Sequence, residues 1–128
     1  MTVASYNYGG STVTVHGEAG DDVIMGGYVG GGGTQISYGE DDDDDLGGGT
    51  GSPDQLYGGA NAVDDVINDL GGASETLDGG SGSDCIEDSN CTFAGGCTCG
   101  TGTDGSPCAG CTSCENAPAH CSLSCPGW

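Results

Sequence analysis

The sequence predicts an all-β protein in which a coiled repeat of short strands is followed by a small disulfide-rich irregular tail. Three observations predict this fold. The chain has 128 residues with 29 glycines but only one Phe and one Trp, so the apolar supply for a core is thin. Single aliphatic residues recur behind Gly-rich, acidic turns from residue 9 to residue 88. All nine cysteines lie between Cys85 and Cys125.

The repeat consists of eight units, each of which runs from a Gly-rich turn into one aliphatic residue. The units span residues 9–16, 17–25, 26–37, 39–47, 48–57, 58–68, 71–78 and 79–87. Their aliphatic residues are Val15, Ile24, Ile36, Leu46, Leu56, Ile67, Leu77 and Ile86, at spacings of 9, 12, 10, 10, 11, 10 and 9 residues. Near-regular spacing of this kind is typical of stacked coils. The segments TVASYNY and STVTV near the N-terminus alternate in the manner of strands.

The charge of the chain restricts its partners. It has 20 acidic and no basic residues, a formal charge of -20. Self-repulsion of this size opposes a compact state, and the sequence has no Lys or Arg to relieve it. Nucleic acid and anionic membranes are therefore poor partners, because both need Lys and Arg to meet phosphate, and we expect no nucleic-acid binding, whereas metal cations are good partners. No apolar run is long enough for membrane insertion, and MTVASYNYGG is not an intact secretory signal. A disordered chain is the alternative that composition leaves open.

Three units carry the repeat most clearly: GEAGDDVIM at 17–25, GGTGSPDQLY at 48–57 and GGSGSDCIE at 79–87. Through them, residues 9–88 resemble the repeats-in-toxin (RTX) family, whose nonapeptide G-G-x-G-x-D-x-U-x binds calcium. The resemblance implies a right-handed parallel β-roll, a β-helix-like solenoid, with several Ca²⁺ ions between successive turns. It also implies that each aliphatic residue points inward.

The resemblance further implies the metal ligands. Carboxylates two positions before the aliphatic residues are expected at Asp22, Asp44, Asp54, Asp65 and Asp84, with Glu75 as a substitute and no acid at Thr34. The rest of the expected set is Asp42, Asp64 and the turn glycines Gly17, Gly20, Gly49, Gly51, Gly59, Gly80 and Gly82. Glycine reaches positive φ, so a turn can aim several carbonyl oxygens at one ion, and calcium takes six to eight oxygens. Because the core is thin, we expect the calcium-free chain to be largely unfolded.

The order of the units predicts an asymmetry. If successive strands alternate between two faces, the turns before Ile24, Leu46, Ile67 and Ile86 stack on one edge, and each carries its acid. The opposite edge carries Thr14, Thr34, Asp54 and Glu75. We therefore expect a continuous calcium ladder on the first edge. Residues 41–45, DDDDD, are either a solvated charge run or a turn with Asp44 as its ligand. They do not fit an EF-hand, which needs glycine where Leu46 stands.

The cysteines divide the chain into residues 1–88, the calcium-binding roll, and residues 89–128, a stapled tail. Nine cysteines in the last 44 residues indicate disulfides and an oxidising compartment. The candidates are Cys85, Cys91, Cys97, Cys99, Cys108, Cys111, Cys114, Cys121 and Cys125, an odd number that leaves one thiol over. The spacing of Cys108, Cys111 and Cys114 is that of an iron–sulfur ligand run. A zinc, iron–sulfur or redox protein is therefore one alternative, and His120 is either a ligand or a loop residue.

These patterns predict an extracellular or cell-surface calcium-binding structural protein. Open strand edges indicate self-association into a homo-oligomer, fibre or matrix. The sequence has no G-x-S-x-G elbow and no basic phosphate clamp, so we expect no enzyme. A calcium-dependent adhesin or surface-binding module is the other alternative, which an exposed aromatic cluster of Tyr28, Tyr38 and Tyr57 would favour. His16 is expected to point outward into solvent.

Overall fold

The structure is a computed structural model that describes residues 2–5, 10–26, 33–49, 53–60, 64–69, 76–82, 84–88, 96–98 and 101–102. These residues form strands and turns, and no helix occurs among them. The strands are β1 (Thr2–Ser5), β2 (Thr12–Ala19), β3 (Val23–Gly26), β4 (Thr34–Asp41), β5 (Asp45–Gly47), β6 (Gln55–Gly59), β7 (Val66–Asp69), β8 (Thr76–Gly82), β9 (Cys85–Asp88), β10 (Gly96–Thr98) and β11 (Thr101–Gly102). The prediction of an all-β chain is confirmed for this part of the protein.

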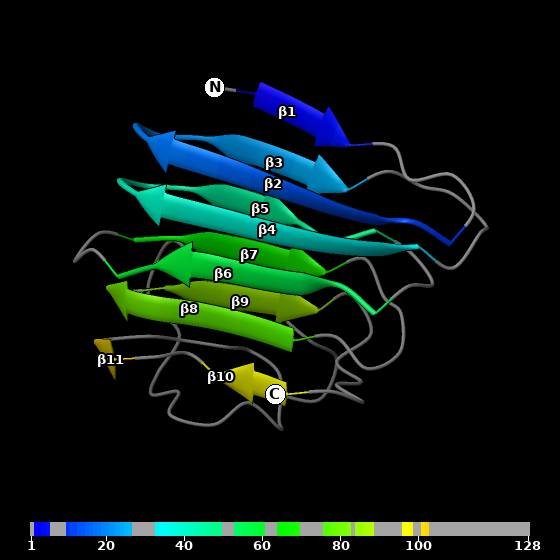
Figure 1. The fold of residues 1–128 in the computed structure, drawn as a ribbon. Helices are drawn as coiled ribbons and strands as arrows, with labels where there is room; N and C mark the ends of the chain where they lie inside the picture. Colours follow the sequence, from blue (N-terminus) through cyan, green and yellow to red (C-terminus); the bar gives the residue numbers. More distant parts are fainter. Residues whose placement is uncertain are drawn as a thin grey trace.

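Successive strands alternate between two sheets, each built of parallel strands, and the two sheets lie one behind the other (Figure 1). The odd-numbered strands form one sheet in the order β1-β3-β5-β7-β9. The even-numbered strands form the other in the order β10-β8-β6-β4-β2, and β11 also pairs with β8. The strands of the two sheets run in opposite directions (Figure 1), so the turns that precede them lie at opposite edges. The predicted alternation of strands is confirmed, and both sheets are open at their ends.

The core consists of aliphatic side chains in two columns, one from each sheet. In the odd-numbered sheet, Ile24, Leu46, Ile67 and Ile86 follow one another in register. In the even-numbered sheet, Leu56 pairs with Leu77. All six side chains are at most 1% exposed and form one cluster, against which Val15 packs partly buried. Six of the eight predicted aliphatic residues are therefore fully buried in the core, and Val15 packs at its edge.

Ile36 is the exception, and the prediction that it points into the core is wrong. Its neighbours Gln35 and Ser37 are buried instead, at 4% and 0% exposure, and Ile36 is only half-buried in register with Gln55. The buried amide is satisfied, since Gln35 Nε2 donates to Ser37 Oγ at 2.7 Å and to Gly47 O at 3.3 Å. Internal hydrogen bonds offset the burial of polar groups, so a polar pair occupies this level of the core.

Part of the tail continues the even-numbered sheet. Residues 96–98 pair with β8 so that Cys97 lies opposite Leu77, and residues 101–102 pair with Ser81 and Gly82. The tail was predicted to be irregular, and at these five residues it is strand instead. Cys85, at the start of β9, is buried and disulfide-bonded. The backbone of Cys97 lies in β10, and the other disulfide candidates fall outside the described residues.

Candidate functional sites

Four aspartates stack at the edge where the odd-numbered strands begin. Each immediately precedes its strand, and each is at most 3% exposed; they are Asp22, Asp44, Asp65 and Asp84. We call these four residues the aspartate column. The N–H of Asp22 donates to Asp44 Oδ1 at 2.9 Å, and the N–H of Asp44 donates to Asp65 Oδ1 at 3.0 Å. The N–H of Asp65 donates to Asp84 Oδ1, also at 3.0 Å. The structure therefore brings together the four acids that were expected on this edge.

The second carboxylate oxygens create an electrostatic problem inside the column. Oδ2 of Asp44 and Oδ2 of Asp65 are buried and have no hydrogen-bond partner in the structure. Burial raises the pKa of Asp44 to about 6, although the hydrogen bond from the Asp22 N–H lowers it in part. Burial likewise raises the pKa of Asp65 to about 7, and the neighbouring carboxylates add to that effect. The column therefore favours either a proton or another positive charge at these atoms.

A row of glycines faces the column and leaves a narrow space beside each carboxylate. A Cβ atom added to Gly17 would lie 2.7 Å from Asp22 Oδ2 and 2.6 Å from Gly39 O. At Gly39 it would meet Asp44 Oδ2 and Gly58 O, and at Gly58 it would meet Asp65 Oδ2 and Gly79 O. At Asp22, Asp44 and Asp65, a carboxylate oxygen and the carbonyl oxygen of the next coil's glycine therefore approach the same space. Only glycine fits at these positions.

Sequence reasoning missed three of these glycines, Gly39, Gly58 and Gly79. The available signal was their position, because each is the first glycine of the segment that leads to an aspartate of the column. Gly17, Gly39 and Gly79 each lie five residues before that aspartate, and Gly58 lies seven residues before it. Other expected ligands lie elsewhere. Gly20 and Gly80 adopt positive φ, Gly59 and Gly82 belong to β6 and β8, and Gly51 and Glu75 fall outside the described residues.

The acids Asp42 and Asp64 are exposed beside the column rather than within it. Asp42 Oδ2 accepts a hydrogen bond from the Gly20 N–H at 3.2 Å, and the Asp64 N–H donates to Asp43 Oδ1 at 3.2 Å. The DDDDD segment thus divides, since Asp41 to Asp43 are exposed and Asp44 is buried. The solvated charge run is confirmed for Asp41 to Asp43, and Asp44 as a metal ligand stays a prediction.

Asp54, at the opposite edge, has a different environment. Its Oδ1 accepts a hydrogen bond from the Gln35 N–H at 2.9 Å, and its Oδ2 accepts one from the Gly49 N–H at 2.8 Å. Asp54 is as buried as the column, at 2% exposure, but both of its oxygens have a backbone donor. Gly49 therefore contributes a donor to this carboxylate, and Asp54 ties the turn to the neighbouring strand.

No group of three or more His, Cys, Asp or Glu side chains in the described ranges comes together as a metal site. A metal ion in the column would therefore need backbone carbonyl oxygens in addition to carboxylates. Calcium accepts this mixture. The buried Oδ2 atoms of Asp44 and Asp65 and the facing glycine carbonyls fit such an ion in donor type and charge.

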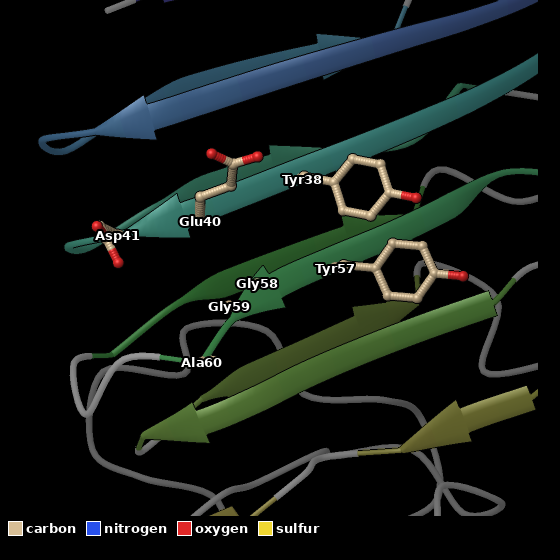
Figure 2. Close-up of a pocket in the computed structure, with 7 residues that line it drawn as sticks. All are labelled: Tyr38, Glu40, Asp41, Tyr57, Gly58, Gly59 and Ala60. Atoms are coloured by element: carbon tan, nitrogen blue, oxygen red, sulfur yellow. The ribbon is translucent and has the colours of Figure 1, made fainter.

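A second feature lies on the outer face of the even-numbered sheet. His16, Tyr38 and Tyr57 are in register on β2, β4 and β6, and their rings stack with centroids 4.9 and 5.1 Å apart. His16 is exposed, as expected, and its Nδ1 lies 2.6 Å from Glu40 Oε1. Figure 2 shows both tyrosine rings projecting from the strands with their hydroxyls on the same side. Beside them is a pocket of about 310 Å³, lined by Tyr38, Glu40, Asp41, Tyr57, Gly58, Gly59 and Ala60.

Comparison with models of known protein families, with curated proteins and with solved structures finds no match. None of the described residues belongs to a helix long and apolar enough to cross a membrane. Tyr28, the third tyrosine of the expected aromatic cluster, falls outside the described residues, as does His120.

Proposed function

We propose that this chain is a non-enzymatic, extracellular calcium-binding protein with a structural role, whose coils wind as a right-handed parallel β-roll. The observation that carries the proposal is the pair of buried oxygens, Asp44 Oδ2 and Asp65 Oδ2, that have no hydrogen-bond partner. An ionised carboxylate buried without a partner costs several kcal/mol. The chain has no Lys or Arg to neutralise it, so the positive charge has to come from solution.

The residues that would hold the ions are the aspartate column and the carbonyls of Gly39, Gly58 and Gly79. When bound, calcium would neutralise the column and join each coil to the next. An all-oxygen donor set favours calcium or magnesium over zinc or copper, and the flexible coordination of calcium suits a mixture of carboxylates and carbonyls. We leave Asp54 out of the ligand set because backbone donors already occupy both of its oxygens.

Circular dichroism with calcium and with a chelator tests this proposal. The calcium-loaded chain is expected to give a β-sheet spectrum, and exhaustive dialysis against EGTA is expected to abolish most of it, because binding and folding are coupled. Native mass spectrometry of the calcium-loaded chain should show several bound ions, and magnesium serves as the matched control cation. An unchanged β-sheet spectrum after dialysis, with no bound ions, would contradict the proposal.

The open sheets support self-association as part of this role. Strand β2 is eight residues long and ends the even-numbered sheet, and β1 ends the odd-numbered one. Exposed strand edges pair readily with another chain, so we propose assembly into fibres or a matrix through these ends. Light scattering at millimolar calcium under oxidising conditions should show large particles that EGTA disperses. A monomer under those conditions would refute assembly and leave calcium binding intact.

A calcium-dependent surface-binding module is the second candidate function. The specific observation that favours it is the ring stack of Tyr38 and Tyr57 beside a pocket. Aromatic rings next to a few polar groups are typical of ligand sites. This function does not exclude the first, because the pocket is on the outer face and the aspartate column is buried.

A further inference from the structure

The pocket beside Tyr38 and Tyr57 exists because small residues replace large ones next to the ring stack. Gly58, Gly59 and Ala60 leave the wall of β6 without bulky side chains (Figure 2). The ring stack also stops here, since the residue in register with Tyr57 on β8 is Asp78. Its final ring is therefore next to a carboxylate-bearing strand rather than another aromatic residue.

Glu40 and Asp41 make this pocket acidic. The Glu40 carboxylate is hydrogen-bonded to the His16 ring, with 2.6 Å between Nδ1 and Oε1. The backbone of Glu40 has a φ of 83°. Glu40 is in register with Glu18 on β2 and with Gly59 on β6. Gly59 in turn pairs with Gly80 on β8. Left-handed backbone is unfavourable for a residue other than glycine, because its Cβ comes too close to the following carbonyl oxygen. Gly80 adopts a similar positive φ at the same register level without a side chain. At Glu40 the fold instead holds a carboxylate beside the tyrosines.

We propose that this pocket binds an organic cation, an alkylammonium or guanidinium group. Aromatic rings attract such cations through their π faces, and the two carboxylates add charge complementarity. The sequence contains no Lys or Arg, so no side chain of these types in the chain itself fills the pocket. The group comes from a free amine or from a basic side chain of a partner protein. This inference deepens the surface-binding candidate function and rests on it.

The alternatives fit the pocket less well. A calcium ion needs six to eight oxygens, whereas the side chains that line this pocket include only two carboxylates and two phenols. An anionic ligand would meet the carboxylates of Glu40 and Asp41, and the chain has no Lys or Arg to offset them. The volume of about 310 Å³ is at the small end of ligand pockets, which suits a single ammonium or guanidinium head.

Ligand-observed NMR on the calcium-loaded full chain tests the inference with a matched pair of probes. Choline carries a quaternary ammonium, and 3,3-dimethylbutan-1-ol is its neutral isostere. We expect saturation transfer to choline and at least about threefold weaker binding of the neutral isostere, since cation–π attraction at exposed sites contributes about 0.5–1 kcal/mol. N-acetyl-lysine amide and N-acetyl-arginine amide form the second arm. Tighter binding of these amides than of choline assigns the cation to a partner protein, and tighter binding of choline assigns it to a free amine.

Two variants and one control locate the site. Glu40→Gln and Tyr57→Leu are each expected to weaken choline binding by about threefold or more. Glu18→Gln removes the same charge from the same register position one strand away, with a similar φ of 76°, and should change binding by less than about twofold. Circular dichroism of each variant confirms that it folds.

Several results would overturn the inference. Equal binding of choline and its neutral isostere would make the pocket an apolar site, and displacement of choline by methyl glucoside would make it a sugar site. Equal losses in Glu18→Gln and Glu40→Gln would indicate general attraction to an acidic surface. A chain that folds with calcium but binds no probe refutes this inference alone, because the circular dichroism response tests the calcium proposal separately.

Discussion

Asp65 and Asp54 occupy equivalent places, each two residues before a buried aliphatic side chain. Asp65 directly precedes β7 and Asp54 directly precedes β6, and these two strands begin at opposite edges of the sheets (Figure 1). Both aspartates are almost fully buried. Asp54 receives a backbone N–H on each carboxylate oxygen, whereas Asp65 receives one on Oδ1 and has no partner at Oδ2. One edge therefore uses aspartate as a hydrogen-bond acceptor that completes a turn. The other stacks charge that the protein itself does not neutralise.

The difference shows that the repeat pattern alone does not define a ligand. An ionised carboxylate with two N–H donors is stable without a cation, because hydrogen bonds to the charged form favour it. A carboxylate that is equally buried but has only one N–H donor is not stabilised to the same extent, so a cation favours its ionised form. The glycines opposite the aspartate column add carbonyl oxygens to the same space, which makes that edge still more favourable for a cation. Four experiments can break or sharpen this comparison.

The largest effect is expected from Gly39→Ala. The added Cβ would overlap Asp44 Oδ2 and the carbonyl oxygen of Gly58, and backbone cannot move aside easily. We expect a loss of about 2–4 kcal/mol in the free energy of unfolding, measured by urea denaturation in saturating calcium. Gly47→Ala is the matched control, because its Cβ would meet chiefly the flexible Met25 side chain, and it should cost less than about 1 kcal/mol. Equal losses would remove the special status of the glycine row.

Asp65→Asn and Asp54→Asn are expected to differ in sign. Without calcium, Asp65→Asn should stabilise the chain by about 1–2 kcal/mol, because it removes a buried charge while Oδ1 keeps its hydrogen bond. Asp54→Asn should destabilise it by about 1–3 kcal/mol with or without calcium, because its NH₂ would face a backbone N–H. Urea denaturation measures the free energy of unfolding of both variants, with EGTA or with calcium, in buffer that contains sucrose to stabilise the folded state. Native mass spectrometry should show fewer bound ions in Asp65→Asn alone. Identical responses of the two variants would contradict the comparison.

The aliphatic and aspartate columns were predictable because most units carry one strong signal, an aliphatic residue with an acid two positions before it. The prediction for Ile36 was wrong because its unit, residues 26–37, is the longest of the eight, so the spacing does not define the register of the strand that follows. The burial of Gln35 and Ser37 depends on hydrogen bonds to Asp54 and Gly47, which lie in other coils. Such non-local partners leave no periodic trace in a sequence.

The same reason explains the other omissions. The contact between Gly39 and the carbonyl of Gly58 joins two coils, so neither glycine stands out in its own unit. The stack of His16, Tyr38 and Tyr57 depends on how β2, β4 and β6 align. The unit spacings of 12 and 10 residues do not define that alignment. Composition and period therefore determine the layers, and cross-coil geometry determines the sites.

Acid should stabilise the calcium-free chain. In the folded state, burial raises the pKa of Asp44 to about 6 and that of Asp65 to about 7, from an ordinary value of 3.8. The folded chain therefore binds more protons than the unfolded chain between about pH 4 and 7, and the free energy of unfolding falls as pH rises through that window. We expect a stronger β-sheet signal at pH 5 than at pH 8, with a free energy of unfolding that is higher at pH 5 by on the order of a few kcal/mol.

This measurement uses circular dichroism in buffers freed of calcium by a chelating resin, because EGTA weakens in acid. Asp65→Asn is the control that separates the buried site from the general charge of the chain. It should flatten the dependence, with most of the remaining change below about pH 6, where Asp44 titrates. A signal that strengthens with rising pH would show that these carboxylates are not the groups that oppose folding.

Asp64→Asn should have the smallest effect, and it tests whether burial or position in the repeat defines a ligand. Asp64 is adjacent to Asp65 in the same turn, but it is exposed, and its N–H bonds the carboxylate of Asp43. Loss of one solvated charge should change stability by no more than about 0.5 kcal/mol and leave the ion count unchanged, because surface charges contribute little. If Asp64→Asn lost as many ions as Asp65→Asn, the exposed acids would share in binding. Burial would then not distinguish the ligands at this edge. The contrast with Asp54 at the opposite edge, where backbone N–H groups occupy both carboxylate oxygens, would remain.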